Sequence, residues 1–469
     1  MSKAKSLERY LVLFVPWALS ALLNSDAVVS YLIAWLGSFF IFYISLTGWV
    51  KPIPTDRSIA EQLMRPIFII QIIFAGYMCC TSIFYFFNVL GYEDFAKVQT
   101  YFLIDQEKLN LTAQCQRYYC LAHASFVAGI LMFMEYPVEK KYYTETKKLA
   151  NVLMITALIS FPGSLLFLKV PGLSQFYIQF SSLSFIAGTL ALAFALPLKK
   201  VGNTLICLAL YIFNLYEALI SGFKEPIIIS ILVLGIFLYP SYKKLVAIIF
   251  VPLIILLFVF LPTYNRIFRQ NAWSGDTDTE EATQLALDAA LNGNDDTGDD
   301  SNWGFLTYRL SEIDMFTKYV KSTPDQVDFY GTQILKQSAI ALVPRIFWPS
   351  KPVTEDLIME RVYNAGVVNR NSNVSAKPPF IVDAYLSAGA FGIFIYLFAY
   401  GAIAQIIALK CERLFGGYTL GTALIFSGLF QIFWRGLSFE FLINTVFWSY
   451  ISMFAIFRIL RSKNILIPI

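Results

Sequence analysis

The sequence predicts an all-α integral membrane protein with about twelve transmembrane helices and one large loop that contains short helices. The 469-residue chain is 57% hydrophobic and only 14% charged, whereas soluble domains are roughly 25% charged. Apolar runs of roughly 20 residues, enough to cross about 30 Å of hydrocarbon as a helix, recur along the chain. Their approximate centres are Trp17, Phe39, Tyr77, Ala128, Leu158, Ile186, Leu210, Leu232, Leu256, Tyr396, Ile425 and Ser449.

The spacing of these runs divides the chain into three segments. Residues 1–262 are expected to form an N-terminal transmembrane bundle of about nine spans. Residues 263–381 form one large polar loop, and residues 382–469 form a C-terminal bundle of about three spans. The length of the chain therefore does not imply several soluble domains.

Basic residues mark alternate connections between the runs and set the orientation. Loops that stay in the cytoplasm are enriched in Lys and Arg. The basic connections carry Lys3, Lys5, Arg9, Lys51, Arg57, Arg65, Lys140, Lys141, Lys147, Lys148, Lys199, Lys200, Lys243, Lys244, Lys410, Arg413, Arg458, Arg461 and Lys463. Both termini are therefore expected in the cytoplasm and the large loop outside it, in the periplasm.

The chain lacks the common signatures of a cofactor or metal site. It has one histidine and six cysteines, with no CxxC pair, no cluster spaced like metal ligands and no nucleotide motif. We therefore expect no metal, no cofactor and no nucleic-acid partner.

The first part of the large loop, residues 276–300, is acidic and contains no Lys or Arg. Its Ala and Leu content predicts a short helix over residues 280–291, ended by Asn292-Gly293-Asn294. The rest is expected to be mobile. Two interpretations stay open, a lid or electrostatic gate on the one hand and a solvated insertion on the other.

The second part of the loop predicts an amphipathic helix over residues 305–320. Apolar residues recur there at three- and four-residue spacing, at Leu306, Leu310, Ile313, Phe316 and Val320. Arg309 and Glu312 lie one turn apart beside this apolar stripe. They form either a surface ion pair, worth about 0.5 kcal/mol, or part of a site.

The third part, ALVPRIFWPSKP at residues 341–352, contains three prolines that stiffen the backbone. Phe347 and Trp348 are typical of the membrane interface. Arg345 and Lys351 are thereby expected in a rigid frame at the depth of the lipid headgroups. An interfacial anchor explains the aromatic residues but not the two fixed cations.

Further charges lie at the outer ends of spans, where ionisable groups tend to face a cavity. By the expected topology they converge on the side of the large loop. They are Lys224, Glu225, Arg266, Arg269, Arg435 and Glu440. Several cations with nearby acids suit a lipid-linked diphosphate, because Arg binds phosphate oxygens through two parallel hydrogen bonds and Lys adds a compact charge.

Three stretches carry a family resemblance, namely Gly222-Phe223-Lys224-Glu225-Pro226, YNRIFRQ at residues 264–270 and VPRIFWPSKP at residues 343–352. With the length, the number of spans and the single large loop, they resemble the O-antigen or oligosaccharide repeat-unit polymerases (Wzy-like proteins). The resemblance covers most of the chain.

The resemblance implies glycosyl transfer at the periplasmic face of a bacterial inner membrane, for O-antigen, capsule or exopolysaccharide synthesis. A growing glycan would leave undecaprenyl diphosphate and join the sugar end of an incoming carrier-linked repeat unit, without a metal. A flippase and a chain-length regulator of the same pathway would be its partners.

The same resemblance assigns roles to residues. Arg309 and Arg345 would be the catalytic arginines and Glu312 the general base, with Glu225 or Glu440 as substitutes. The residues that would bind the substrate are Lys224, Glu225, Arg266 and Arg269, joined by Lys351 and Arg435 on chemical grounds.

Two alternatives remain open. The related O-antigen ligases use a histidine in the outer loop, and this loop contains none. A transporter or flippase of a lipid-linked glycan would also have about twelve spans, but such folds commonly show two similar halves, and no internal repeat is evident here.

Overall fold

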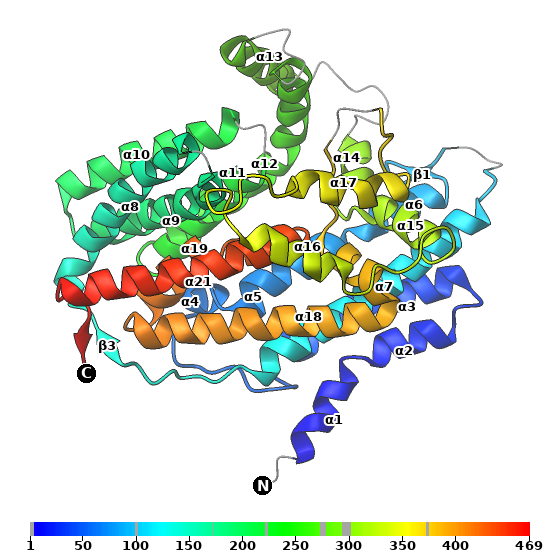
Figure 1. Ribbon diagram of the computed structural model, residues 1–469, viewed down its shortest axis with the longest axis horizontal. Helices are drawn as coiled ribbons and strands as arrows, with labels where there is room; N and C mark the ends of the chain where they lie inside the picture. The colour runs from blue at the N-terminus through cyan, green and yellow to red at the C-terminus, as the bar shows by residue number, and fades with distance from the viewer. Residues whose placement is uncertain are drawn as a thin grey trace.

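The computed structural model is a bundle of helices with a helical loop region packed on it (Figure 1). It describes residues 4–98, 102–170, 172–220, 224–272, 278–292, 302–371 and 375–469. About 74% of the described residues are helical. Strands are confined to two short antiparallel pairs in the described residues, β1 with β2 and β3 with β4.

The first half of the chain supplies the N-terminal bundle. Its elements are α1 (Ala4–Val12), α2 (Val15–Leu22), α3 (Ala27–Leu46), α4 (Ile59–Leu63), α5 (Pro66–Gln71), η1 (Ile72–Cys80), α6 (Ser82–Val89), β1 (Tyr92–Glu93), β2 (Ala96–Lys97), α7 (Gln106–Met132), β3 (Tyr142–Tyr143), α8 (Thr146–Lys169), η2 (Ser174–Phe176), α9 (Tyr177–Ala195), α10 (Val201–Ile220), α11 (Lys224–Leu238) and α12 (Lys243–Ala272).

The second half supplies the loop helices and the last spans. Its elements are α13 (Thr279–Asn292), α14 (Asn302–Tyr308), α15 (Ile313–Ser322), α16 (Gln333–Leu342), α17 (Thr354–Asn364), α18 (Phe380–Leu414), η4 (Tyr418–Phe426), α19 (Ser427–Leu429), α20 (Ile432–Arg435), α21 (Phe439–Ser462) and β4 (Ile467–Pro468).

Within the described residues, seven helices are long and apolar enough to cross a membrane. They are Ala27–Leu46, Pro66–Val89, Lys148–Lys169, Ser174–Ala195, Val201–Ile220, Phe380–Leu414 and Phe439–Ser462. Seven of the expected span centres fall in these helices, and two more fall in the shorter apolar helices Ile227–Leu238 and Tyr418–Leu429. The chain is thus predominantly helical and has the helices of a membrane protein.

Helices α7 and α18 form the centre of the bundle and run parallel. Tyr118 contacts Tyr385 with ring centroids 5.1 Å apart, and Phe126 contacts Tyr400 at 5.5 Å, so the contacts advance in the same direction along both helices. A Cβ at Gly401 would lie 2.2 Å from the carbonyl oxygen of Phe126. The backbones therefore approach at a distance that only glycine permits, as is common between membrane helices.

The expected helix over residues 305–320 is wrong as a continuous element. It is two helices, α14 and α15, separated by a turn in which Glu312 adopts a left-handed conformation with φ 53° and ψ 19°. Leu310, Ile313 and Phe316 are nonetheless buried. The apolar spacing therefore predicted these buried residues correctly, although they belong to α15 and to the turn before it and not to one continuous helix.

The expected short helix over residues 280–291 is confirmed as α13, which packs its Ala282 and Ala286 against Tyr264 and Phe268 of α12. Figure 1 shows this helical pair projecting from one side of the molecule. The remaining acidic residues of the segment, 276–277 and 293–300, lie outside the described residues.

Candidate functional site

The loop helices pack on one end of the bundle, which we call the loop face. Hydrogen bonds fix them there, from Tyr119 Oη to the carbonyl oxygen of Ser311 (2.8 Å) and from Tyr385 Oη to that of Thr323 (2.7 Å). Trp448 Nε1 of α21 donates to the carbonyl oxygen of Leu342, at the end of α16 (2.9 Å). The loop is therefore tied to α7, α18 and α21 by separate contacts.

A buried ionic cluster joins α17 of the loop to the first turns of α18 and α21. Arg361 donates from Nη1 to Glu440 Oε1 (2.8 Å) and from Nη2 to Glu440 Oε2 (3.0 Å). Its Nη2 also lies 3.3 Å from Asp383 Oδ2, and its Nη1 donates to Gln337 Oε1 of α16 (2.9 Å). The guanidinium of Arg361 thus joins α17 to α18 and α21 directly, and to α16 through Gln337.

The cluster is sealed from solvent. Arg361 is 1% exposed, and Asp383 and Glu440 are 0% exposed. Burial alone would lower the pKa of Arg361, but Asp383 and Glu440 outweigh that effect and hold the pKa above its ordinary value. The amide of Phe439 also donates to Asp383 Oδ2 (2.9 Å), so the N-terminus of α21 contributes to the same site.

The turn over residues 343–352 brings Arg345 and Lys351 together. Arg345 donates to the carbonyl oxygens of Pro349 (3.3 Å), Lys351 (3.1 Å) and Pro352 (3.3 Å). Lys351 Nζ donates to the carbonyl oxygens of Ala341 (3.2 Å) and Val343 (2.6 Å). The side chains of Arg345 and Lys351 therefore stabilise the proline-rich turn, and the turn fixes the positions of both cations.

The charge at this turn is unbalanced. Lys351 is 7% exposed, and its pKa lies below the ordinary value, first because of burial and then because of the nearby Arg345 charge. Neither cation has a carboxylate partner among the ion pairs of the described residues. Beside them, Phe347 is 77% exposed and Trp348 40% exposed.

Arg309 and Glu312 lie in the turn between α14 and α15. The Arg309 side chain is exposed, and its carbonyl oxygen accepts a hydrogen bond from Tyr77 Oη of η1 (2.8 Å). Glu312 is half-buried, and its charge contributes to the raised pKa of Tyr319, which is raised first by burial. The backbone of Arg309 therefore contacts η1, whereas the turn that contains Arg345 lies beside Gly172, between α8 and α9.

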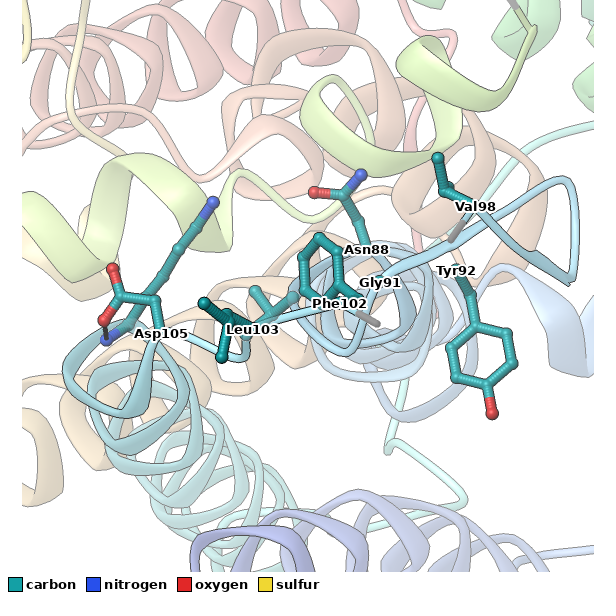
Figure 2. A pocket seen from close by; sticks show the side chains of 9 residues that line it. Asn88, Gly91, Tyr92, Val98, Phe102, Leu103 and Asp105 are labelled. Carbon is teal, nitrogen blue, oxygen red and sulfur yellow. Dashed lines mark hydrogen bonds between the residues drawn. The ribbon is translucent and has the colours of Figure 1, made fainter. Parts of the chain in front are cut away.

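A pocket of about 340 Å³ opens near Arg309 at the end of α6 (Figure 2). Tyr308 Oη donates to Asn88 Oδ1 at its wall (3.2 Å). Gly91 has φ +82°, and a Cβ there would lie 2.4 Å from the ring of Phe102, so this wall requires glycine. The pocket is lined by Asn88, Val89, Gly91, Tyr92, Val98, Phe102, Leu103, Asp105 and Lys108.

The family model described as "Domain of unknown function (DUF8712)" matches residues 15–468. The chain belongs to the DUF8712 family. Comparison with curated proteins and with solved structures gives no significant match. The match covers both bundles and the loop, including Arg361, Asp383 and Glu440 of this chain.

The remaining expected site residues of this DUF8712 protein are dispersed. Arg435 is half-buried at the end of α20 and Arg266 half-buried in α12. Lys224 and Glu225 lie in the first turn of α11 and Arg269 near the end of α12, but their side chains lie outside the described part of the molecule. Glu440 pairs with Arg361.

Sequence reasoning missed Arg361, Asp383 and Gln337. Arg361 lies in TEDLIMERVYN at residues 354–364, where it is one of four charged residues, as is common on a solvated helix. Asp383 was a detectable signal, because it begins a 35-residue apolar helix as the one acidic residue of its first turn. A carboxylate at such a position needs a buried cation.

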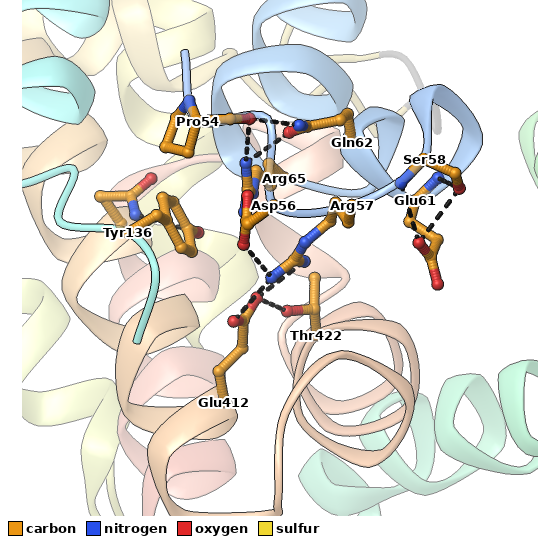
Figure 3. Close-up of polar contacts among 11 residues, drawn as sticks. Pro54, Asp56, Arg57, Ser58, Glu61, Gln62, Arg65, Tyr136, Glu412 and Thr422 are labelled. Atoms are coloured by element: carbon orange, nitrogen blue, oxygen red, sulfur yellow. Dashed lines mark hydrogen bonds and ion pairs between the residues drawn. The ribbon is translucent and has the colours of Figure 1, made fainter. Parts of the chain in front are cut away.

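A second ionic network lies at the opposite end of α18 (Figure 3). Arg57 donates to both oxygens of Glu412 (3.0 and 2.9 Å), and Arg65 donates to both oxygens of Asp56 (2.6 and 2.7 Å). The Arg65 guanidinium lies 3.8 Å from the ring centroid of Tyr136. This network fastens residues 56–65 to the last turns of α18 in the DUF8712 fold.

Proposed function

We propose that this DUF8712 protein is a polysaccharide polymerase that joins oligosaccharide repeat units carried on a polyprenyl diphosphate. In this proposal about twelve helices cross the inner membrane, both termini are cytoplasmic, and the loop face is periplasmic. The substrate is a lipid-linked oligosaccharide, and a flippase and a chain-length regulator act beside the enzyme.

The observation that carries the proposal is the pair of cations Arg345 and Lys351. They lie close enough for the charge of Arg345 to lower the pKa of Lys351, and no carboxylate of the described ion pairs compensates them. Two like charges held together without a counter-ion are unfavourable unless an anion binds. The exposed Phe347 and Trp348 beside them suit the headgroup region, where a lipid diphosphate lies.

A second cationic position, Arg309, supports a reaction between two lipid-linked substrates. It contacts a different part of the bundle from the Arg345 turn, and it too lacks a carboxylate partner among the described ion pairs. Both the growing glycan and the incoming unit carry a diphosphate, so two cationic sites are required. We assign the Arg345 turn to one diphosphate and Arg309 to the other.

The chemistry is displacement at the anomeric carbon of the growing glycan. A sugar hydroxyl of the incoming unit forms the new C–O bond, the bond from the anomeric carbon to the diphosphate breaks, and the electron pair leaves with the diphosphate. Guanidinium groups stabilise the charge that develops on that leaving group. Glu312 takes the proton of the attacking hydroxyl.

The pocket beside Tyr308 suits the acceptor sugar. Its volume lies at the lower end of the range for small-molecule sites. The amide of Asn88 and the aromatic rings of Tyr92 and Phe102 offer hydrogen bonds and flat apolar faces. This position leaves the acceptor hydroxyl near the turn that contains Glu312.

The test is the length distribution of lipid-linked and surface glycan in cells that lack the gene, complemented with variants. Arg345→Ala is expected to leave only single repeat units, because a lost phosphate contact raises the barrier without disturbing the spans. Arg370→Ala is the matched control, since Arg370 pairs with Glu360 on the surface of the same loop. It is expected to restore the full ladder.

Other outcomes would contradict the proposal. A normal ladder with Arg345→Ala removes Arg345 from the site. Long lipid-linked polymer that is never attached in the deletion strain indicates an O-antigen ligase, and repeat units trapped on the cytoplasmic side indicate a transporter or flippase.

A further inference from the structure

The Arg361 cluster contains more negative than positive charge. One guanidinium faces two carboxylates, Asp383 and Glu440, and all three side chains are at most 1% exposed. With both acids ionised the cluster would hold a net charge of −1 away from water, which is strongly unfavourable. A proton or another cation is therefore needed to neutralise the second carboxylate.

The hydrogen bonds differ between the two carboxylates. Both oxygens of Glu440 accept from Arg361 in a two-point contact, the arrangement that favours an ionised acid. Asp383 accepts through Oδ2 alone, from Arg361 and from the amide of Phe439. Its Oδ1 lies 3.2 Å from Arg361 Nη2 but is buried and makes no hydrogen bond.

Among the described residues, Arg361 is the one cation that forms an ion pair with Asp383 or Glu440. Tyr319 of α15 faces both Asp383 and Arg361, and its raised pKa, caused first by burial and then by Asp383, keeps it a neutral hydroxyl. Helix α16 contributes the neutral amide of Gln337. Among the described residues, Lys377 pairs with Glu355 (3.6 Å) and Arg370 with Glu360 (2.7 Å), so the neighbouring cations already have acids.

We propose that the Arg361 cluster is a proton-binding site, in which Asp383 Oδ1 carries one proton taken up from solvent at neutral pH. The step forms one O–H bond and leaves Arg361 and Glu440 as a neutral ion pair. Two carboxylates that share one cation cannot both stay ionised at low dielectric, and the acid with an oxygen that accepts no hydrogen bond, Asp383, is the one that protonates.

The proton site has a mechanical consequence. Arg361 belongs to the loop, whereas Asp383 and Glu440 begin the last two long apolar helices. Loss of the proton restores the excess charge at the joint between them. The packing of α17 against α18 and α21 should therefore weaken as the pH rises, because the folded protein binds one proton more than the unfolded chain in that range.

The first measurement is the infrared absorption of protonated carboxyl groups in the detergent-purified protein, titrated from neutral to alkaline pH. The wild-type protein is expected to show a band at neutral pH that disappears on titration, and Asp383→Asn is expected to lack it. Glu360→Gln, on the same helix as Arg361, should leave it unchanged. Asp314→Asn is measured alongside, because burial also raises the pKa of Asp314.

The second measurement is thermal unfolding against pH in the same proteins. The unfolding equilibrium of the wild type should shift toward the unfolded state by up to tenfold per pH unit across the titration, and Asp383→Asn should lack that shift. Identical carboxyl absorption in wild type and Asp383→Asn would overturn the proposal. So would a midpoint that depends on sodium or potassium concentration but not on pH, because a metal ion would then supply the charge.

Discussion

The two ends of α18 carry ionic clusters that differ in their charge balance. At the end shown in Figure 3, two arginines meet two carboxylates, and each pair is joined by two hydrogen bonds. At the loop face, one arginine meets two carboxylates. Both clusters tie segments that are far apart in sequence, since Arg57 and Glu412 are 355 residues apart and Arg361 and Glu440 are 79 apart.

The difference distinguishes a purely structural ionic network from a cluster whose protonation can change. The balanced cluster is complete as it stands, and the proximity of Tyr136 to Arg65 further stabilises its cation. The unbalanced cluster must take up a positive charge from outside. The two ends of one helix therefore differ in whether solution conditions can alter them.

The largest effect is expected from Arg361→Ala. Removal of the guanidinium leaves two buried carboxylates without a cation and should lower the free energy of unfolding by about 3–5 kcal/mol. Thermal unfolding of the detergent-purified protein measures it. Arg361→Lys keeps the charge but loses the two-point contact, so it should be intermediate. A change in Arg361→Ala no larger than that of a surface variant would show that the cluster does not hold the loop.

Glu412→Gln should have the next largest effect. It leaves Arg57 without its carboxylate, and hydrogen bonds to charged groups contribute about 1.5–3 kcal/mol. Thr422→Val removes only the hydroxyl that donates to Glu412 and should lower stability by about 1 kcal/mol. If Glu412→Gln left the free energy of unfolding unchanged, the balanced cluster would not stabilise the fold.

Asp383→Asn sharpens the comparison, because the same type of substitution should have a small effect at the loop face. An amide resembles the protonated acid, so at neutral pH Asp383→Asn should change the free energy of unfolding by less than Glu412→Gln does, within about 1 kcal/mol. Both variants are measured in one thermal series. A loss for Asp383→Asn equal to that for Glu412→Gln would mean that both acids are ionised.

The smallest effect is expected from Glu360→Gln. Arg370 lowers the pKa of Glu360 through a hydrogen bond, so any stabilisation is present above the ordinary carboxyl pKa and is lost as the pH falls through the lowered value. Both side chains are largely exposed, and surface pairs contribute little. The midpoint should not change at neutral pH. A large decrease would show that α17 depends on surface pairs as well as on Arg361.

Composition and apolar periodicity were sufficient to predict a helical membrane protein, because both depend only on which residues avoid water. They could not predict the break at Glu312. The spacing of Leu310, Ile313 and Phe316 fits one helix as well as two short ones, and the left-handed conformation of Glu312 depends on how α14 and α15 pack on α6 and α7.

The candidate site was predictable only in part. Arg345 and Lys351 were identified as a fixed pair, and they are joined in the structure. Glu440 was singled out as a charge at a span end, but its partner Arg361 was not. Local sequence does not show which of the loop arginines is buried, because the burial of Arg361 and the exposure of Arg370 follow from their tertiary contacts.

The buried ion pair also constrains how the molecule is assembled during synthesis. Arg361 is made before α18, and its main partner, Glu440, is made 79 residues later, at the start of α21. Until the final span has been inserted, α17 lacks the two-point contact that holds it. The loop face is therefore completed last, and a nascent chain interrupted before α21 would leave this arginine without its principal acid, a state that quality-control proteases could recognise.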